Sequence, residues 1–460
     1  MNRPTEIAQN AELERGLPAR PTGSTILLLA AATLCLTVGL PTDATASGFY
    51  LPGRGVQPMG RGGAYVASGE GNLNSVWYNP ANLATLEGTE LMVDTAVIGT
   101  FSQFHRSSRY TQGGRLVDYP SVHNQSLPRP DPPILIYASG LKFPERGPQR
   151  YTLINNDKSL IAFLGGSVAY EINDDLRVGA GLYDMVAHFE LVNTTSSYTG
   201  VYGRPEDRDL DILTKIAFQD FFNPTGNLGL WWEPVDKFQT AFSVQLPGLV
   251  RDKSAKMEVR MPSHPLYDQG ELSNDTVSGA LRFPWVLRAA LRWDDDNFDV
   301  ELAGVWEGWG VFDRITVSPN NIRHTGIPGV GAIPIGPLNI PQKWQNTFSV
   351  RAGGDWRVSD PLTLRAGYIF ETGAPPDEFY SVFAPDADKH VFSGGFSYEW
   401  SDFTLDVSAA YYALNNKQIT NSQMRQINPI DTEDELATVI GNGGYKTSNL
   451  IVGTGITYNF

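Results

Sequence analysis

Residues 285–294 read W-V-L-R-A-A-L-R-W-D, and the two faces of this stretch differ in chemistry. Apolar side chains recur at every second position from Trp285 to Trp293, whereas Arg288 and Arg292 share the opposite face. A period of two predicts a β-strand whose faces meet different surroundings. Strands of soluble sheets average about five or six residues, while membrane barrel strands need about 9–11. The stretch therefore predicts a transmembrane barrel strand, apolar toward lipid and polar toward the lumen.

The same alternation recurs along the chain. Residues 362–371, 402–413 and 449–460 repeat it, and Arg365 falls on the predicted lumen face. Short polar turns alternate with long connections, as in outer-membrane barrels whose long loops are extracellular. The long connections are predicted at 193–213, 252–278, 314–343, 372–389 and 415–446. An even strand number is required, so we predict an all-β fold, an antiparallel barrel of about 14 strands, with the count uncertain between residues 105 and 158.

Composition narrows the classes of function. Lys and Arg total 35 against 50 Asp and Glu, a formal net charge of −15. Nucleic acid needs a basic footprint, so we expect no nucleic-acid partner. The six histidines show no metal-ligand spacing, and no nucleotide-binding loop, G-x-S-x-G motif or convincing triad is present in the sequence. We therefore predict no enzyme activity, no catalytic residue, no metal and no cofactor.

The N-terminal 46 residues are predicted to be a secretory signal peptide. An apolar run from Thr25 to Leu40 contains the single cysteine, Cys35, and is followed by Ala44-Thr45-Ala46, a cleavage signal of A-x-A type. A membrane anchor is the alternative, because the run approaches the shortest spanning length of about 17 residues. No other apolar run of the sequence is long enough for a membrane helix.

Residues 47–88 are predicted to form a glycine-rich plug, or hatch, in the lumen of a barrel made by residues 89–460. Five glycines between Gly60 and Gly71 permit positive φ angles and close backbone approach. Aromatic residues such as Phe49, Trp77 and Tyr78 make this stretch too apolar for a disordered tail. We therefore place it inside the barrel.

Several motifs resemble the FadL-type outer-membrane transporters of long-chain fatty acids and related hydrophobic compounds. Ser47-Gly48-Phe49 looks like the mature N-terminus of that family, and Gly60–Gly71 looks like its hatch. Trp77-Tyr78-Asn79-Pro80-Ala81 is similar to its N-P-A motif, and Trp344–Glu371 resembles a late barrel hairpin. The resemblance implies a 14-stranded barrel, a hatch, capture of ligand by extracellular loops, passive transport, and sideways release of the substrate.

The residues leave four points open. Asn79-Pro80 fits either an ordinary turn or a contact that fixes the hatch to the wall. Arg288, Arg292 and Arg365 are candidate ligand-binding residues in the lumen, or structural arginines paired with acids such as Asp294 or Glu371. The uncharged loop 327–340 either packs into the barrel mouth or meets a ligand. Asp184, which interrupts an apolar face, marks either a gap in the wall or the outer rim.

We expect a bacterial outer-membrane transporter for passive uptake of long-chain fatty acids or similar hydrophobic molecules. The alternatives are a water-filled porin, a structural or adhesive barrel, and a soluble exported β protein. Expected partners are the hydrophobic substrate, outer-membrane lipid, and the barrel assembly machinery. The last would recognise the final strand, whose terminal aromatic residue Phe460 resembles the C-terminal signature of outer-membrane proteins.

Overall fold

The computed structural model describes residues 54–112, 115–125, 129–131, 136–326, 331–429 and 436–460. All of them belong to one compact unit, Thr42–Phe460. The predicted signal peptide, Gly48 and Phe49 lie outside the described residues. None of the described helices is long and apolar enough to cross a membrane.

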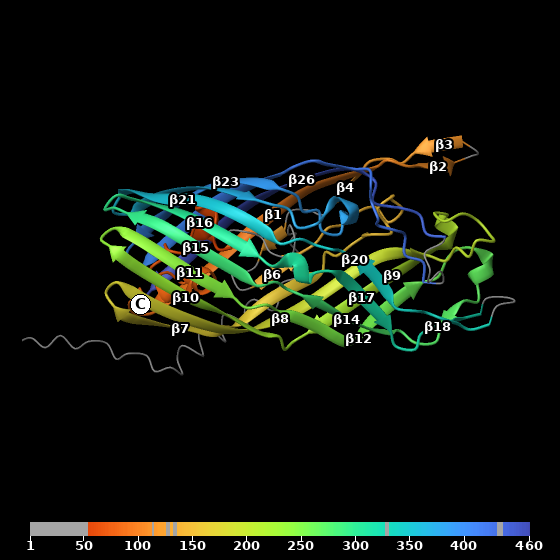
Figure 1. The fold of residues 1–460 in the computed structure, drawn as a ribbon, viewed down its shortest axis with the longest axis horizontal. Coiled ribbons are helices and arrows are strands. Elements are labelled where there is room, and N and C mark those ends of the chain that lie inside the picture. Colours follow the sequence, from red (N-terminus) through yellow and green to blue (C-terminus); the bar gives the residue numbers. More distant parts are fainter. Residues whose placement is uncertain (1–53, 113–114, 126–128, 132–135, 327–330, 430–435) are drawn as a thin grey trace, which may run out of the picture. The chain divides into compact units, whose positions relative to one another are not determined.

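A single antiparallel sheet closes on itself. The first strand, β1 (Glu90–Arg106), pairs with the last, β26 (Gly443–Asn459), in an unbroken register from Glu90↔Asn459 to Arg106↔Gly443. The register given for the other described wall strands is also antiparallel, and the long strands run side by side in Figure 1. A sheet that pairs its first strand with its last is a barrel, which confirms the predicted fold class.

The described residues cross the barrel wall fourteen times when each interrupted strand is counted once. The uninterrupted crossings besides β1 and β26 are β6 (Ile136–Ser139), β7 (Ser159–Asn173), β8 (Leu176–Ser196), β22 (Leu362–Glu371) and β23 (Lys389–Trp400). The interrupted ones are β4 (Val122–His123) with β5 (Arg129–Asp131), β9 (Asp211–Asp220) with β10 (Pro224–Val235), β11 (Phe238–Gln245) with β12 (Leu249–Arg260), β14 (Thr276–Arg282) with β15 (Val286–Asp294), β16 (Phe298–Glu307) with β17 (Arg314–Pro319), β20 (Leu338–Pro341) with β21 (Thr347–Ser359), and β24 (Phe403–Leu414) with β25 (Lys417–Ile419). The number agrees with the prediction.

Smaller elements decorate the barrel. The loops carry a hairpin of β2 (Arg109–Gln112) and β3 (Arg115–Asp118), and a small sheet of β13 (Glu271–Leu272), β18 (Arg323–Thr325) and β19 (Ile333–Pro334). Short helices are α2 (Val56–Gly60), α3 (Ser75–Tyr78), η1 (Pro80–Thr85), η2 (Arg208–Leu210), η3 (Pro265–Tyr267), η4 (Trp309–Val311) and η5 (Asp377–Phe379). The first three belong to residues 54–88, which we call the inner segment.

The alternation decides which side chains enter the lumen. On β15, Arg288 and Arg292 are buried, whereas Leu291 and Trp293 each keep 49% of their surface exposed. The same division holds on β22, where Arg365 is buried and Leu364 is exposed. The predicted faces are therefore confirmed for both strands.

Five consecutive crossings are interrupted at one level of the wall. The breaks separate β9 from β10, β11 from β12, β14 from β15, β16 from β17, and β20 from β21. Pro247 and Pro284 lie in two of them, and proline cannot donate the backbone hydrogen bond that a continuous strand needs. Bonds such as Phe283 N to Gly248 O, at 2.9 Å, hold neighbouring breaks together.

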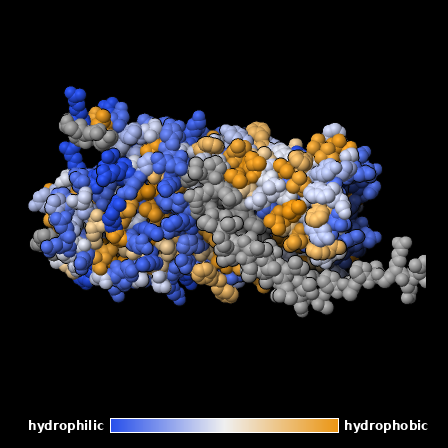
Figure 2. Space-filling view, turned by 180° about the vertical axis from the view of Figure 1, so that it is seen from behind, coloured by the Kyte–Doolittle hydropathy of each residue, from blue (hydrophilic) through white to orange (hydrophobic). Residues whose placement is uncertain are grey.

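The breaks divide the wall into two zones with different exteriors. Between the short turns and the breaks, exposed side chains are apolar, for example Leu228, Phe242 and Leu302. Figure 2 shows orange residues concentrated over one part of the surface and blue ones over the other. The nine residues of β15 span about 30 Å along the strand, or roughly 21 Å of height at a tilt near 45°, close to the ~25 Å apolar band of outer-membrane barrels.

Beyond the breaks, the outer face of the wall is polar and the inner face is apolar. On β12, Val250 and Met257 are buried inside while Lys256 and Glu258 are exposed outside. These crossings therefore continue past the membrane on the side of the long loops. The connections predicted at 193–213, 252–278 and 314–343 were partly wrong, because each contains wall strands. The outer face of these strands is polar because it meets water and not lipid. In the sequence, these strands therefore have the polar composition of a loop.

Candidate functional site

The inner segment is anchored inside the barrel by two acids of β16. Glu301, with no exposed surface, accepts hydrogen bonds from the backbone N–H groups of Val66 (2.8 Å), Ala67 (3.2 Å) and Ser68 (2.8 Å). Asp299 accepts two bonds from the Arg61 guanidinium, at 3.1 and 2.5 Å. Charge-assisted bonds of this kind are roughly twice as strong as neutral ones. The segment is therefore fixed to one side of the lumen wall.

The N-P-A motif contacts the wall at β10, three crossings along from β16. Asn79 Nδ2 donates to the carbonyl oxygens of Val66 (2.9 Å) and of Leu230 on β10 (3.1 Å), while its Oδ1 accepts from Ala81 N at 3.1 Å. A Cβ atom at Gly229 would lie 1.9 Å from Asn79 Oδ1, so only glycine permits this approach. Asn79 thus bonds the inner segment to the wall, which is the contact that the sequence left open.

Trp77 and Tyr78 face the lumen from this turn. Trp77 meets Phe163 of β7 edge to face at 4.9 Å, and the Arg54 guanidinium lies 4.0 Å from the Trp77 ring centroid. The Tyr78 hydroxyl donates to Arg54 O at 3.0 Å. Burial raises the pKa of Tyr78 to about 12, so this hydroxyl keeps its proton at neutral pH.

The three predicted arginines all point inward but differ in their partners. Arg292 pairs with Glu70 (3.0 Å), Asp294 (3.0 Å) and Asp299 (3.5 Å). Arg365 pairs with Asp406 (3.2 Å) and Asp355 (3.5 Å). Arg292 and Arg365 are therefore structural arginines paired with acids, which was the alternative to ligand binding. Glu371 pairs instead with Lys389 (2.8 Å) and Arg351 (3.6 Å).

Arg288 is different. Its Nη2 donates to Gln245 Oε1 at 2.9 Å, but no described carboxylate lies within ion-pairing distance, and its Nη1 has no partner among the described residues. Arg351 and Arg54 repel it, and Glu307 attracts it without forming an ion pair. A buried guanidinium with an unused donor is costly, and an anion would satisfy it. Arg288 is therefore the strongest candidate for contact with a ligand head group.

The inner segment separates two regions of the lumen. On the side of the short turns is a polar cavity of about 440 Å³, whose lining includes Arg61, Glu70, Arg292, Asp355 and Glu399. On the other side, buried apolar residues form a continuous cluster that reaches the long loops. Its members include Phe163, Met185, Phe283, Trp309, Phe312, Trp344, Ile369, Val391 and Tyr412. An apolar molecule would be more stable in the apolar cluster than in the polar cavity.

The long loops meet at a partly buried carboxylate. Glu206, between β8 and β9, accepts a bond from Arg106 at 2.7 Å and one from the Thr438 hydroxyl at 3.0 Å, and it also bonds the Tyr119 hydroxyl. These partners come from the end of β1 and from two other connections. Burial alone would raise the pKa of Glu206, but Arg106 and the hydroxyl donors hold it below the ordinary value of 4.5.

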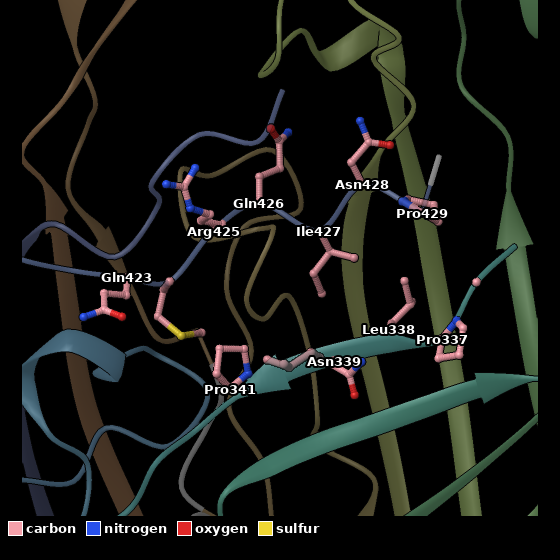
Figure 3. Close-up of a pocket in the computed structure, with 13 residues that line it drawn as sticks. Pro337, Leu338, Asn339, Pro341, Gln423, Arg425, Gln426, Ile427, Asn428 and Pro429 are labelled. Atoms are coloured by element: carbon pink, nitrogen blue, oxygen red, sulfur yellow. The ribbon is translucent and has the colours of Figure 1, made fainter. Parts of the chain in front are cut away.

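A groove of about 290 Å³ opens between two of these loops. One side is Gly336–Pro341 and the other is Gln423–Pro429. In Figure 3, Ile427 points toward Leu338 while Gln426 and Asn428 point away. Leu338 and Ile340 also pack against the apolar cluster of the lumen. The described part of the predicted apolar loop, 331–340, therefore packs on the barrel mouth and lines a groove as well; residues 327–330 lie outside the described part.

Asp184 has a local role at the rim of the membrane zone. Its carboxylate accepts from Asn223 N at 2.6 Å, where β8 changes its partner from β10 to β9. This geometry matches the outer-rim interpretation. At the other end of the barrel, the exposed ring of Phe460 meets Tyr458 edge to face at 4.6 Å, within the aromatic residues that flank the short turns.

A closed sheet with an apolar exterior band, short turns on one rim and a buried inner segment defines a transmembrane β-barrel with an occupied lumen. Residues 153–460 match the family described as outer membrane protein transport protein (OMPP1/FadL/TodX), and the chain belongs to this family. It is accordingly a protein of the bacterial outer membrane.

Solved structures and one curated relative agree with this assignment. A Pseudomonas aeruginosa FadL homologue superposes with a TM-score of 0.69 at 15% identity, covering 90% of this chain and all of that one. The P. putida toluene transporter TodX gives a TM-score of 0.60 at 13% identity, covering 89% and 99% of the two chains. A Neisseria meningitidis serogroup B protein described as "putative outer membrane protein" is 27% identical over 123 residues, 26% of this chain and 25% of that protein. At these identities the structures show a shared fold, and the chain aligns with only a quarter of the curated relative.

Proposed function

We propose that the protein mediates passive uptake of hydrophobic molecules, long-chain fatty acids among them, without a chemical step. The observation that carries the proposal is the apolar cluster that fills the lumen from the loop groove down to the inner segment. An ordinary water-filled porin has a polar channel instead. Membership of an outer-membrane transport family, and likeness to a FadL homologue and a toluene transporter, support the same conclusion.

The proposed route begins at the groove between Leu338 and Ile427. Its size lies near the lower end of small-molecule sites, roughly 300–1,000 Å³, so it would hold part of a long chain. From there the molecule would enter the apolar cluster and reach Trp77. Each methylene moved from water into such surroundings gains about 0.8 kcal/mol, which drives the transfer without an energy source.

Arg288 would bind the carboxylate of a fatty acid. Its Nη1 has no hydrogen-bond partner among the described residues, and Tyr78 and Arg54 lie beside it. A charge-assisted bond to a buried arginine contributes about 1.5–3 kcal/mol. A hydrocarbon such as toluene has no group that could use this donor.

The inner segment would act as the hatch. The charged cavity behind it disfavours an apolar molecule, so we propose that release occurs sideways through the wall, as the family resemblance implies, and not straight through the cavity. Recognition of β26 and Phe460 by the barrel assembly machinery remains part of the same proposal.

The test compares two substrates in a strain that lacks its own uptake system. The variant Arg288→Gln should lower uptake of labelled oleate about tenfold, the equivalent of one lost charged hydrogen bond, and leave toluene uptake unchanged. Arg288→Lys, which keeps the charge, should restore much of the oleate uptake. Equal uptake of oleate by all three proteins would overturn the role of Arg288. No saturable uptake of either substrate by the unaltered protein would overturn the function itself.

A further inference from the structure

The outer wall carries a basic patch just beyond the membrane zone. Arg251 on β12 and Arg282 on β14 are both exposed on the outside of the barrel. Leu249 pairs with Arg282 and Arg251 with Ala280, so the two arginines are diagonal neighbours on one face. Continuing the β14–β17 register by two residues sets Arg282 opposite Arg314. Lys253 and Lys343 complete the patch.

The acids near this patch are already engaged. Asp220 accepts backbone N–H bonds from Arg251 (2.7 Å) and Phe222 (3.2 Å). Asp252 accepts from the N–H groups of Gln219 (2.9 Å) and Ser254 (2.8 Å). Asp313 pairs with both Arg314 (2.8 Å) and Lys343 (2.6 Å).

Two arginines of the patch therefore lack an anionic partner. Neither Arg251 nor Arg282 forms an ion pair with a carboxylate of the described residues. The patch holds five basic side chains and three acids, in a chain whose net charge is −15. A local excess of positive charge on so acidic a protein needs an explanation beyond solubility.

The position of the patch indicates its partner. Exposed aromatic residues lie directly on its membrane side: Phe221 and Phe222 follow β9, and Trp285 comes three residues after Arg282. Three residues of extended chain span at most about 10 Å. Aromatic residues of barrels mark the lipid head-group level, so the arginines lie at or just above the head groups of the outer leaflet.

We infer that this basic patch binds the phosphate groups of outer-leaflet lipid, the glycolipid lipid A in particular. Guanidinium groups match phosphate oxygens in a bidentate geometry, and two partner-free arginines on adjacent strands would share one diphosphorylated head group. The contact would hold the protein at a fixed depth in the membrane beneath its extracellular extension. It is independent of what the lumen transports.

The test uses the whole protein in phosphatidylcholine nanodiscs with or without diphosphoryl lipid A, and native mass spectrometry measures bound lipid A. The double variant Arg251→Ala/Arg282→Ala should bind about thirtyfold more weakly, which is the loss expected when two basic residues near an anionic lipid surface are removed. A matched control, Lys256→Ala/Arg260→Ala, removes the same charge from β12 further from the membrane. It should bind like the unaltered protein.

Further variants separate charge from folding. Arg251→Lys/Arg282→Lys should retain most binding, and heat-modifiable migration in gels shows that each barrel is folded. Lipid A without phosphates should bind no better to the unaltered protein than to the double variant. Equal losses in the double variant and the control, undiminished binding in the double variant, or full competition by inorganic phosphate at the concentration of the lipid would each overturn the inference.

Discussion

Arg61 of the inner segment donates two hydrogen bonds to Asp299 on β16 and also pairs with Asp355 on β21 at 2.8 Å. The arginine and Asp299 are almost completely buried. Asp355 joins Arg61 to Arg365, which lies 3.5 Å away on β22. One guanidinium thus ties the inner segment to two neighbouring strands, β16 and β21, and Asp355 extends the network to β22.

Removing Arg61 should loosen the inner segment while leaving the barrel closed. Breaking a buried pair by removing one partner costs about 3–5 kcal/mol, and Arg61→Ala leaves two acids without their main partner. We expect ion conductance in planar bilayers where the unaltered protein shows little. The exposed Arg357, which pairs with Asp294 at 3.1 Å, provides the control Arg357→Ala. Equal conductance of Arg61→Ala and the unaltered protein would show that other contacts keep the segment in place.

The contact between Asn79 and the wall depends on Gly229. In Gly229→Ala the new methyl group would lie 1.9 Å from Asn79 Oδ1, so the N-P-A turn must shift. We expect oleate uptake to fall severalfold with the barrel still heat-modifiable. Gly304→Ala is the matched control, because a Cβ atom there meets nothing within 4 Å. An equal effect of both substitutions would assign the loss to strand propensity and not to the turn.

Glu206 should make the loop network sensitive to acid. The partners of Glu206 hold its folded-state pKa below 4.5, so its contribution to stability is complete above that value and is lost as the pH falls through the lower folded pKa. Hydrogen exchange of the loops should therefore rise only in strong acid. Glu206→Gln should raise exchange already at neutral pH and abolish the pH dependence. Identical profiles for the two proteins would exclude Glu206 as the group that links the loops.

The groove should matter most when substrate is scarce. Ile427→Asp places a charge where an apolar chain would bind and removes a contact worth about 1.5–3 kcal/mol. We expect the oleate concentration for half-maximal uptake to rise about tenfold while the maximal rate changes little. Ile427→Leu preserves volume and polarity and serves as the control. A lower maximal rate with an unchanged oleate concentration for half-maximal uptake would show that Ile427 acts in passage through the barrel and not in capture.

The barrel could be predicted from sequence because the lipid-facing strands alternate so regularly. Trp293, Leu364 and Phe403 are exposed to the membrane as expected. The part of the wall beyond the breaks was not predicted, for a physical reason. On β12 the outer face is polar and the apolar residues Val250 and Met257 face inward, so the segment has the composition of a loop.

The candidate site was only partly predictable. The alternation placed Arg288 and Arg292 in the lumen, but it could not tell which of them lacks an acid. The partner Glu70 lies 222 positions before Arg292, and only the folded inner segment brings them together. The hydrogen bonds that the backbone N–H groups of Val66 and Ser68 donate to Glu301 could not be predicted from the sequence. Nearly every residue carries the same main-chain donor, so no residue type marks these positions.

The most direct test is a crystal structure of the protein with a fatty acid brominated at the end of its chain. Anomalous scattering should place the bromine in the apolar cluster between the groove and Trp77, with density for the carboxylate at Arg288. Bromine found only in the polar cavity behind the inner segment, or only on the outer surface of the barrel, would contradict a hydrophobic route through the lumen.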